Sequence, residues 1–284
     1  MSRIHDALKK LEAERAAGHG ASNGHGNGNG NGNGNGNGNG NGNGNGRRRG
    51  WQWLLSGRDK RNGHNMPVNF DLGPEVEDAY QRLGTSVLVT PGGLPADQPR
   101  LLGVVASRQG EGTTTTAAVF ASILVRRRGG RVVVVEANLR TPSFQTAFGI
   151  RPVPGLVELI EGKASLSAAA QSTSVPNLFA IAAGESTLPA TTLFDSPALP
   201  AVLAQIREQF DFAIVDLPPV NVYGDALILG PRLDAAIIVI EADATRVPDV
   251  ERARRTLERS GVRFVGSVLN RRRSYIPAFL EEML

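Results

Sequence analysis

Residues 101–106 read LLGVVA and run directly into SRQGEGTTTT at 107–116. An apolar strand, a glycine-rich turn and an Ala-rich helical segment in this order form the frame of a phosphate-binding loop, whose backbone N–H groups surround phosphate oxygens. Such loops place a Lys directly before a Ser or Thr. The Lys neutralises phosphate oxygens and the hydroxyl holds Mg²⁺. Here Thr113 stands in the place of the Lys, so the stretch predicts a phosphate loop that lacks its cation.

Two later apolar strands also end in polar residues. The strand at 131–135 runs into EANLRTP at 136–142, and the strand at 210–215 runs into DLPP at 216–219. Ligands of open α/β sheets bind at the carboxyl ends of parallel strands, so these residues are expected near the loop. Asp216 lies where a carboxylate holds Mg²⁺, directly or through water, in proteins with such loops. The alternative for the glycine cluster alone is an ordinary βα turn.

Taken in order, these segments resemble the bacterial tyrosine kinase family of exopolysaccharide export systems (the CpsD, CapB and Wzc cytoplasmic-domain type), a branch of the MinD/ParA-type P-loop ATPases. Members read Gly-Glu-Gly-Lys-Thr-Thr at the loop, Asp-Ala-Asp-Leu-Arg-Arg-Pro at the second segment and Tyr-Asp-Tyr-x-Ile-x-Asp-Thr-Pro-Pro at the third. The resemblance covers roughly residues 74–270. It implies an α/β fold with a twisted, mostly parallel sheet flanked by helices, and ATP or ADP with Mg²⁺ as ligands.

The same resemblance assigns roles to individual residues. Thr114 and Asp216 match the metal-binding positions, and Asp216 and Glu136 are the candidate catalytic residues if the chain is an enzyme. Asn138 replaces an acidic residue, and Glu136 is longer than its counterpart by one methylene. Nucleotide contacts are implied for Gly110, Glu111, Gly112, Thr113, Thr114, Thr115 and Asn270.

The missing charges argue against efficient catalysis. Loss of one preorganised charge-stabilising group costs on the order of 10² to 10³ in rate. The amide of Asn138 accepts hydrogen bonds but neither neutralises a cation nor acts as a useful base. Arg108 aligns with the signature lysine of MinD-like loops, yet its planar guanidinium replaces a point charge poorly. We therefore expect nucleotide and Mg²⁺ binding that is weak or absent, and phosphoryl transfer that is very slow or absent.

Composition limits the class of protein. The chain has 284 residues, 40% of them hydrophobic, and no Cys, which allows one large core and excludes disulfides and thiolate metal sites. No apolar run approaches the roughly 20 residues of a membrane-spanning helix, and no signal-peptide core opens the chain, so a cytoplasmic protein is expected. The formal charge is only +4 and no aromatic-basic stripe occurs in the folded part, so nucleic acid is not expected as a partner.

The chain divides into three expected segments. Residues 1–17 predict an amphipathic helix, which either binds a partner or folds onto its own domain. Residues 18–65 are expected to be a disordered linker, in which an Asn-Gly repeat is followed by the basic-Trp segment RRRGWQWLL at 47–55. This segment either rests on an anionic inner-membrane surface or membrane partner, or covers part of the domain. Residues 66–284 are expected to form the tyrosine-kinase-like P-loop domain.

Alternation of apolar strands with helical patterns predicts parallel pairing through right-handed crossovers. Beyond the three strands above, strands are expected at 178–182, 235–241 and 263–269. Helices are expected at 76–89, 113–127, 197–209, 224–229 and 248–260.

The function implied by the resemblance is that of a degenerate tyrosine-kinase-like protein. It would regulate an inner-membrane polysaccharide co-polymerase or chain-length determinant in exopolysaccharide biosynthesis. The expected location is the cytoplasm, with possible peripheral contact with the inner membrane. Two alternatives stay open: an active autokinase with Tyr275 as acceptor, and a ParA-like positioning ATPase. The ring-forming helix of the family has two arginines where Gln81 and Gly84 stand here, so the oligomeric state is left open.

Overall fold

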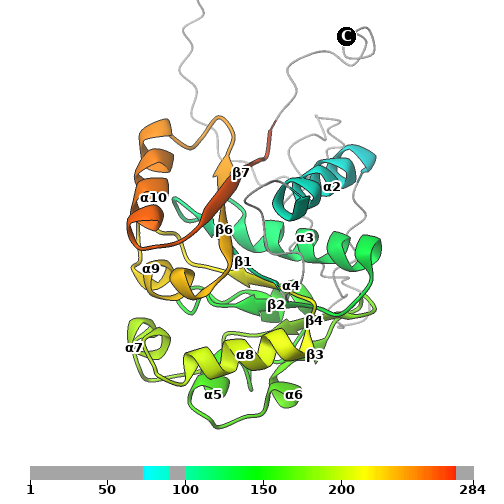
Figure 1. Ribbon diagram of the computed structural model, residues 1–284, viewed down its shortest axis with the longest axis vertical. Coiled ribbons are helices and arrows are strands. Elements are labelled where there is room, and N and C mark those ends of the chain that lie inside the picture. The colour runs from blue at the N-terminus through cyan, green and yellow to red at the C-terminus, as the bar shows by residue number, and fades with distance from the viewer. Residues whose placement is uncertain (1–72, 90–99, 273–284) are drawn as a thin grey trace, which may run out of the picture. The chain divides into compact units, whose positions relative to one another are not determined.

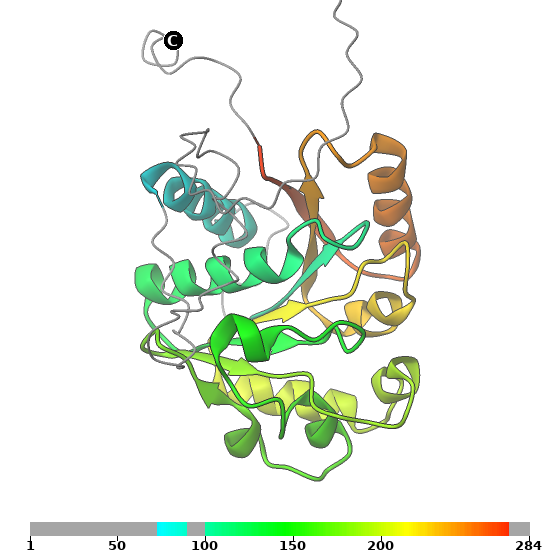
Figure 2. The same cartoon turned by 180° about the vertical axis from the view of Figure 1, so that it is seen from behind.

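The computed structural model describes residues 73–89 and 100–272. The expected segments at 1–17 and 18–65 lie outside the described residues, as does Tyr275. The described part contains one seven-stranded sheet in the order β3-β4-β2-β5-β1-β6-β7, with helices on both faces (Figure 1 and, from behind, Figure 2). Neighbouring strands are parallel except β3 and β4, which are antiparallel. The expected α/β fold with a mostly parallel sheet is confirmed.

The central strands are continuous apolar runs because helices cover both of their faces. The strands are β1 (Arg100–Ala106), β2 (Val132–Glu136), β3 (Gln171–Ser172), β4 (Leu178–Ile181), β5 (Phe212–Asp216), β6 (Ala235–Glu241) and β7 (Phe264–Asn270). The helices are α2 (Pro74–Val89), α3 (Thr113–Arg128), α4 (Phe144–Phe148), α5 (Leu156–Ile160), α6 (Leu166–Ala169), α7 (Ala190–Phe194), α8 (Leu199–Gln209), α9 (Asp225–Leu229) and α10 (Val247–Arg259), and a 3-10 turn follows α9 at Gly230–Arg232.

The long elements lie where the sequence predicts them, and their ends differ from the expected ends by two residues or fewer. Helices α4, α5, α6 and α7 and strand β3 were not predicted. Each has five residues or fewer, which is too short for a helical or alternating pattern to stand out in the sequence.

Two apolar layers hold the sheet between its helices. One layer packs α3 and α4 against one face and contains Phe120 and Phe144, with Val87 of α2 at its margin. The other packs α5 to α10 against the opposite face and contains Phe194 and Leu257. No helix in the described ranges combines the length and the apolar character needed to cross a bilayer.

The sheet order decides where a ligand can bind. The crossover from β1 to β2 passes over β5, whereas the next neighbour of β1 on its other side is β6. The crossover from β5 to β6 passes over β1 in the opposite direction, so a crevice opens between the carboxyl ends of β1 and β5. The loop at 107–112 lies at that point, between β1 and α3.

Candidate functional site

The backbone of the loop has the form of a phosphate cradle. Gly110 and Gly112 have φ angles of 90° and 94°, in the left-handed region that favours glycine. A Cβ on Gly112 would lie 2.1 Å from Nδ2 of Asn270, so space also requires glycine there. The 16-residue helix α3 begins at Thr113, and the unpaired N–H groups of its first turn, at the positive end of the helix dipole, suit an anion.

Glu111 braces this loop from within. Its side chain is buried, and its Oε2 accepts hydrogen bonds from the N–H groups of Ser107 at 2.8 Å and Arg108 at 2.9 Å. Its Oε1 accepts from the Ser107 hydroxyl at 3.0 Å and from the Thr245 hydroxyl. The carboxylate is thus occupied inside the loop, and a phosphate contact from Glu111 would have to come from its N–H group. Sequence reasoning did not single out Ser107 or Thr245.

Thr114 and Asp216 meet at the floor of the site. The Thr114 hydroxyl donates to Oδ2 of Asp216 at 2.6 Å. Asp216 is 1% exposed, and its Oδ1 has no hydrogen-bond partner among the described residues. Burial raises the pKa of Asp216 to about 7, against the lowering effect of the Thr114 hydrogen bond, and the Glu136 carboxylate adds to the rise. An unpartnered buried carboxylate oxygen beside a hydroxyl fits Mg²⁺, which prefers oxygen ligands.

The position of the missing Lys carries no charge. Thr113 is the first residue of α3, and its side chain is neutral. Arg271, near the loop at the end of β7, instead places Nη1 2.8 Å from Oε1 of Glu241. Arg108 is exposed to solvent. The described residues therefore offer a triphosphate a cradle of N–H groups without a side-chain cation at position 113.

Asn270 lies over the loop. Its Nδ2 donates to the carbonyl oxygen of Glu111 at 2.9 Å, beside the Cα of Gly112. The amide that the family resemblance assigns to nucleotide contact is thus bonded to the loop itself. A nucleotide contact through Nδ2 would have to share or replace this bond.

Glu136, at the end of β2, pairs in register with Asp216 of β5. Its side chain is buried, and its Oε1 accepts from the N–H groups of Ser143 and, at 2.8 Å, Phe144. Its Oε2 accepts from the N–H of Ala183 at 3.1 Å. Burial raises the pKa of Glu136, and these hydrogen bonds oppose the rise. The carboxylate thereby caps α4 and holds the segment after β4 in place.

The residues that follow β2 are also engaged. Asn138 closes a turn with Thr141, since its Nδ2 donates to Oγ1 at 3.0 Å and its Oδ1 accepts from the N–H at 3.3 Å. Arg140 forms a two-point ion pair with the fully buried Asp225, at 2.9 and 3.1 Å, and lies over the Tyr223 ring. Sequence reasoning missed the Arg140 pair. The only signal was the Arg in the second family motif.

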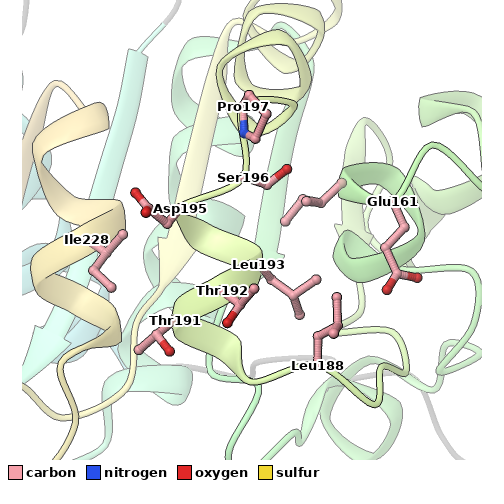
Figure 3. A pocket seen from close by; sticks show the side chains of 10 residues that line it. Glu161, Leu188, Thr191, Thr192, Leu193, Asp195, Ser196, Pro197 and Ile228 are labelled. Atoms are coloured by element: carbon pink, nitrogen blue, oxygen red, sulfur yellow. The ribbon is translucent and has the colours of Figure 1, made fainter.

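A separate hollow of about 730 Å³ lies between the ends of α5, α7 and α9 and is shown in Figure 3. Its carboxylates have partners in the domain, with Glu161 2.6 Å from Lys163 and Asp195 3.6 Å from Arg232. None of the expected site residues lines it. The hollow is therefore not part of the loop site.

No family model matches the chain. The tyrosine-protein kinase CpsD of Streptococcus pneumoniae serotype 4 is 29% identical to it over 198 residues, which are 69% of this chain and 85% of CpsD. The tyrosine-protein kinase YwqD of Bacillus subtilis is 28% identical over 161 residues, which are 57% of this chain and 68% of YwqD. Each match includes more than half of both chains, so the likeness is not confined to the loop motif.

Solved structures that resemble the chain include kinase domains, as do the relatives found by sequence. The VpsO kinase domain is 27% identical with a TM-score of 0.62, and the match covers 70% of this chain and 96% of that domain. The kinase domain of Escherichia coli ETK shares the fold at 20% identity, with a TM-score of 0.67 over 80% and 90% of the two chains. The cell division ATPase MinD of Pyrococcus furiosus shares it at 24% identity, with a TM-score of 0.53 over 65% and 78%. By sequence and by fold, the chain is a homologue of bacterial tyrosine-protein kinases such as CpsD and YwqD, built on the P-loop ATPase fold of MinD.

Proposed function

We propose that the chain is a regulatory, kinase-related protein of exopolysaccharide biosynthesis that transfers phosphoryl groups very slowly or not at all. It acts on the cytoplasmic side of the inner membrane with a polysaccharide co-polymerase or chain-length protein. The observation that carries the proposal is the loop itself. Its cradle and its Thr114–Asp216 pair are intact, whereas Thr113 leaves the charge of a triphosphate without its neutralising side chain.

Weak binding of ATP or ADP with Mg²⁺ is part of the proposal. Thr114 and Asp216 would hold the ion, and the N–H groups from Gly110 to Thr114 would hold the phosphates. The described residues contain no group of three or more His, Cys, Asp or Glu side chains that could hold a metal ion together, so most remaining ligands would be water and phosphate oxygens, as is usual for Mg²⁺. When bound, Mg²⁺ supplies charge neutralisation at the phosphates.

The partner is proposed from the family. The family resemblance implies a separate membrane protein that supplies an activating tail. The similarity to the tyrosine-protein kinases CpsD and YwqD supports this arrangement. A protein that keeps the sheet and the loop geometry while losing the loop charge is suited to binding and control of that partner.

A second candidate is a slow autokinase with Tyr275 as acceptor. It is favoured by the Thr114–Asp216 pair, because Oδ1 of Asp216 is buried and has no partner among the described residues. A cation supplied by the membrane partner would then replace the missing Lys. Both candidates use the same fold and differ in whether phosphate is transferred.

Radiolabelled ATP distinguishes the two candidates. The full chain is incubated with Mg²⁺ and labelled ATP, with and without the membrane protein that co-purifies with it. We expect no labelling of the wild type above that of Asp216→Asn, and measurable labelling in Thr113→Lys/Asn138→Asp. Labelling of the wild type that disappears in Tyr275→Phe would support the autokinase and contradict the regulatory proposal.

A further inference from the structure

The carboxyl end of α3 carries a concentration of positive charge. Arg126, Arg127 and Arg128 form its last turn, and Arg131 follows two glycines later. All four are exposed, and we call them the arginine cluster. Helix α3 leaves the phosphate loop and runs 16 residues, about 24 Å, to the start of β2, so the cluster lies at the end of α3 away from the loop (Figures 1 and 2).

Acidic residues neutralise only part of this cluster. Arg127 lies 3.6 Å from Glu77 of α2, and Asp211 accepts a hydrogen bond from the N–H of Arg131 at 2.7 Å. Neither Arg126 nor Arg128 forms an ion pair with a residue of the described ranges. Basic residues suit the negative end of a helix dipole, but Arg131 lies beyond the helix. Arg126 and Arg128 therefore carry charges that no acidic residue of the described ranges pairs.

Arg131 is held at the surface by two aromatic rings, which belong to the apolar layer on the other face of the sheet from α3. Its guanidinium carbon lies 4.9 Å from the centroids of both Phe179 and Phe210. The two rings pack edge to face at 5.4 Å. Stacking of this kind fixes a guanidinium without removing its charge, and it leaves N–H donors for phosphate oxygens.

Shallow hollows flank the end of α3. One of about 170 Å³ lies between α2 and α3 and is lined in part by Arg127 and Arg128. Another of about 350 Å³ lies between Arg126 and the segment at 174–177. The arginines that line these two hollows can donate hydrogen bonds to phosphate groups presented on a surface.

We infer that the arginine cluster binds the anionic phospholipid surface of a membrane. Duplex DNA is the rival, but the two tryptophans and two leucines at 51–55 suit a bilayer interface better than a duplex. Stable peripheral membrane binding needs two modest signals, and the sequence RRRGWQWLL at 47–55 has the chemistry of a second one. The choice of a bilayer rests on the proposed function at the inner membrane. Binding here would leave the phosphate loop, at the other end of α3, accessible to a partner.

Vesicle sedimentation of the full chain tests this inference. The wild type should sediment with mixed phosphatidylglycerol and phosphatidylcholine vesicles at low salt and much less at high salt. Arg126→Gln/Arg128→Gln should bind about 25-fold more weakly, because each arginine near an anionic surface contributes about fivefold. The matched control Arg246→Gln/Arg252→Gln removes two exposed arginines around α10 and should stay within about twofold of the wild type. Thermal melting followed by circular dichroism shows that both variants fold.

Several results would overturn the inference. These are equal losses in the two double variants, equal binding to pure phosphatidylcholine, and failure of the wild type to bind anionic vesicles. Tight binding to duplex DNA that the cluster variant alone loses would assign the surface to nucleic acid instead. The vesicle assay contains no nucleotide, so its failure leaves the account of the loop untouched, and a failed nucleotide assay leaves the vesicle result untouched.

Discussion

The carboxyl ends of β1 and β2 both differ from the motifs of the kinase family that the sequence resembles, but in different ways. After β2, the substituted residues have found structural partners: Glu136 accepts three backbone N–H groups, and Asn138 closes a turn. At the loop after β1, Thr113 brings no charge, and Oδ1 of Asp216 has no partner among the described residues. The contacts of the first region hold the scaffold together, whereas the buried oxygen without a partner in the second marks a place that suits a ligand or water.

The largest expected effect tests the structural role of Glu136. Glu136→Ala leaves three N–H groups, two of them buried, without an acceptor and should lower the free energy of unfolding by about 4 kcal/mol. Asn138→Ala, two residues on in a more exposed turn, should cost less than about 1 kcal/mol. Urea unfolding of both variants measures the difference. Equal, small losses would mean that the end of β2 is not part of the scaffold.

The pH dependence of stability tests the unsatisfied state of Asp216. Its pKa is about 7 in the folded protein and 3.8 for an ordinary Asp, so the folded state binds more protons between these values. The free energy of unfolding should therefore fall as pH rises from about 4 to 7. Asp216→Asn cannot titrate and should exceed the wild type by about 4 kcal/mol at pH 8, with little difference at pH 4.

Added Mg²⁺ gives a second test of the state of Asp216. The ion favours the ionised carboxylate, so millimolar Mg²⁺ should raise the melting temperature of the wild type at pH 8 and leave that of Asp216→Asn unchanged. Wild-type stability that is flat from pH 4 to 7 would show that Asp216 is already satisfied in the protein. The floor of the loop site would then resemble the end of β2.

Alanine substitution of the two loop glycines should have a smaller effect on stability, and Gly110→Ala serves as the control for Gly112→Ala. Gly112→Ala combines a φ of 94° with a Cβ contact of 2.1 Å to Asn270, whereas Gly110→Ala has a φ of 90° and no neighbour within 4 Å. We expect losses of about 3 and 1 kcal/mol, respectively, in chemical unfolding. Similar losses would show that Asn270 moves aside easily and does not restrict the loop.

The parts of the molecule that follow local patterns could be predicted from sequence. The glycine spacing at 107–116 and the buried runs of β1, β2, β5 and β6 are signals contained within a few residues. Contacts between distant residues could not be predicted in this way. Arg140 and Asp225 are 85 positions apart, and Glu111 and Thr245 are 134 positions apart. The role of Glu136 likewise depends on N–H groups that only the folded chain brings to it.

The smallest effect bears on nucleotide affinity. Thr113→Lys should bind Mg²⁺-ATP at least about tenfold more tightly than the wild type, because one charge-assisted hydrogen bond is worth about 1.5–3 kcal/mol. Gln109→Lys adds the same charge at an exposed loop residue and should change the affinity less than about threefold.

Isothermal titration calorimetry of the wild type and these two variants with Mg²⁺-ATP tests the central claim most directly. The account predicts weak or undetectable binding by the wild type and by Gln109→Lys, and a clear isotherm for Thr113→Lys. Tight binding by the wild type that Thr113→Lys does not improve would contradict it, because the charge at position 113 would then not be the element that the site lacks.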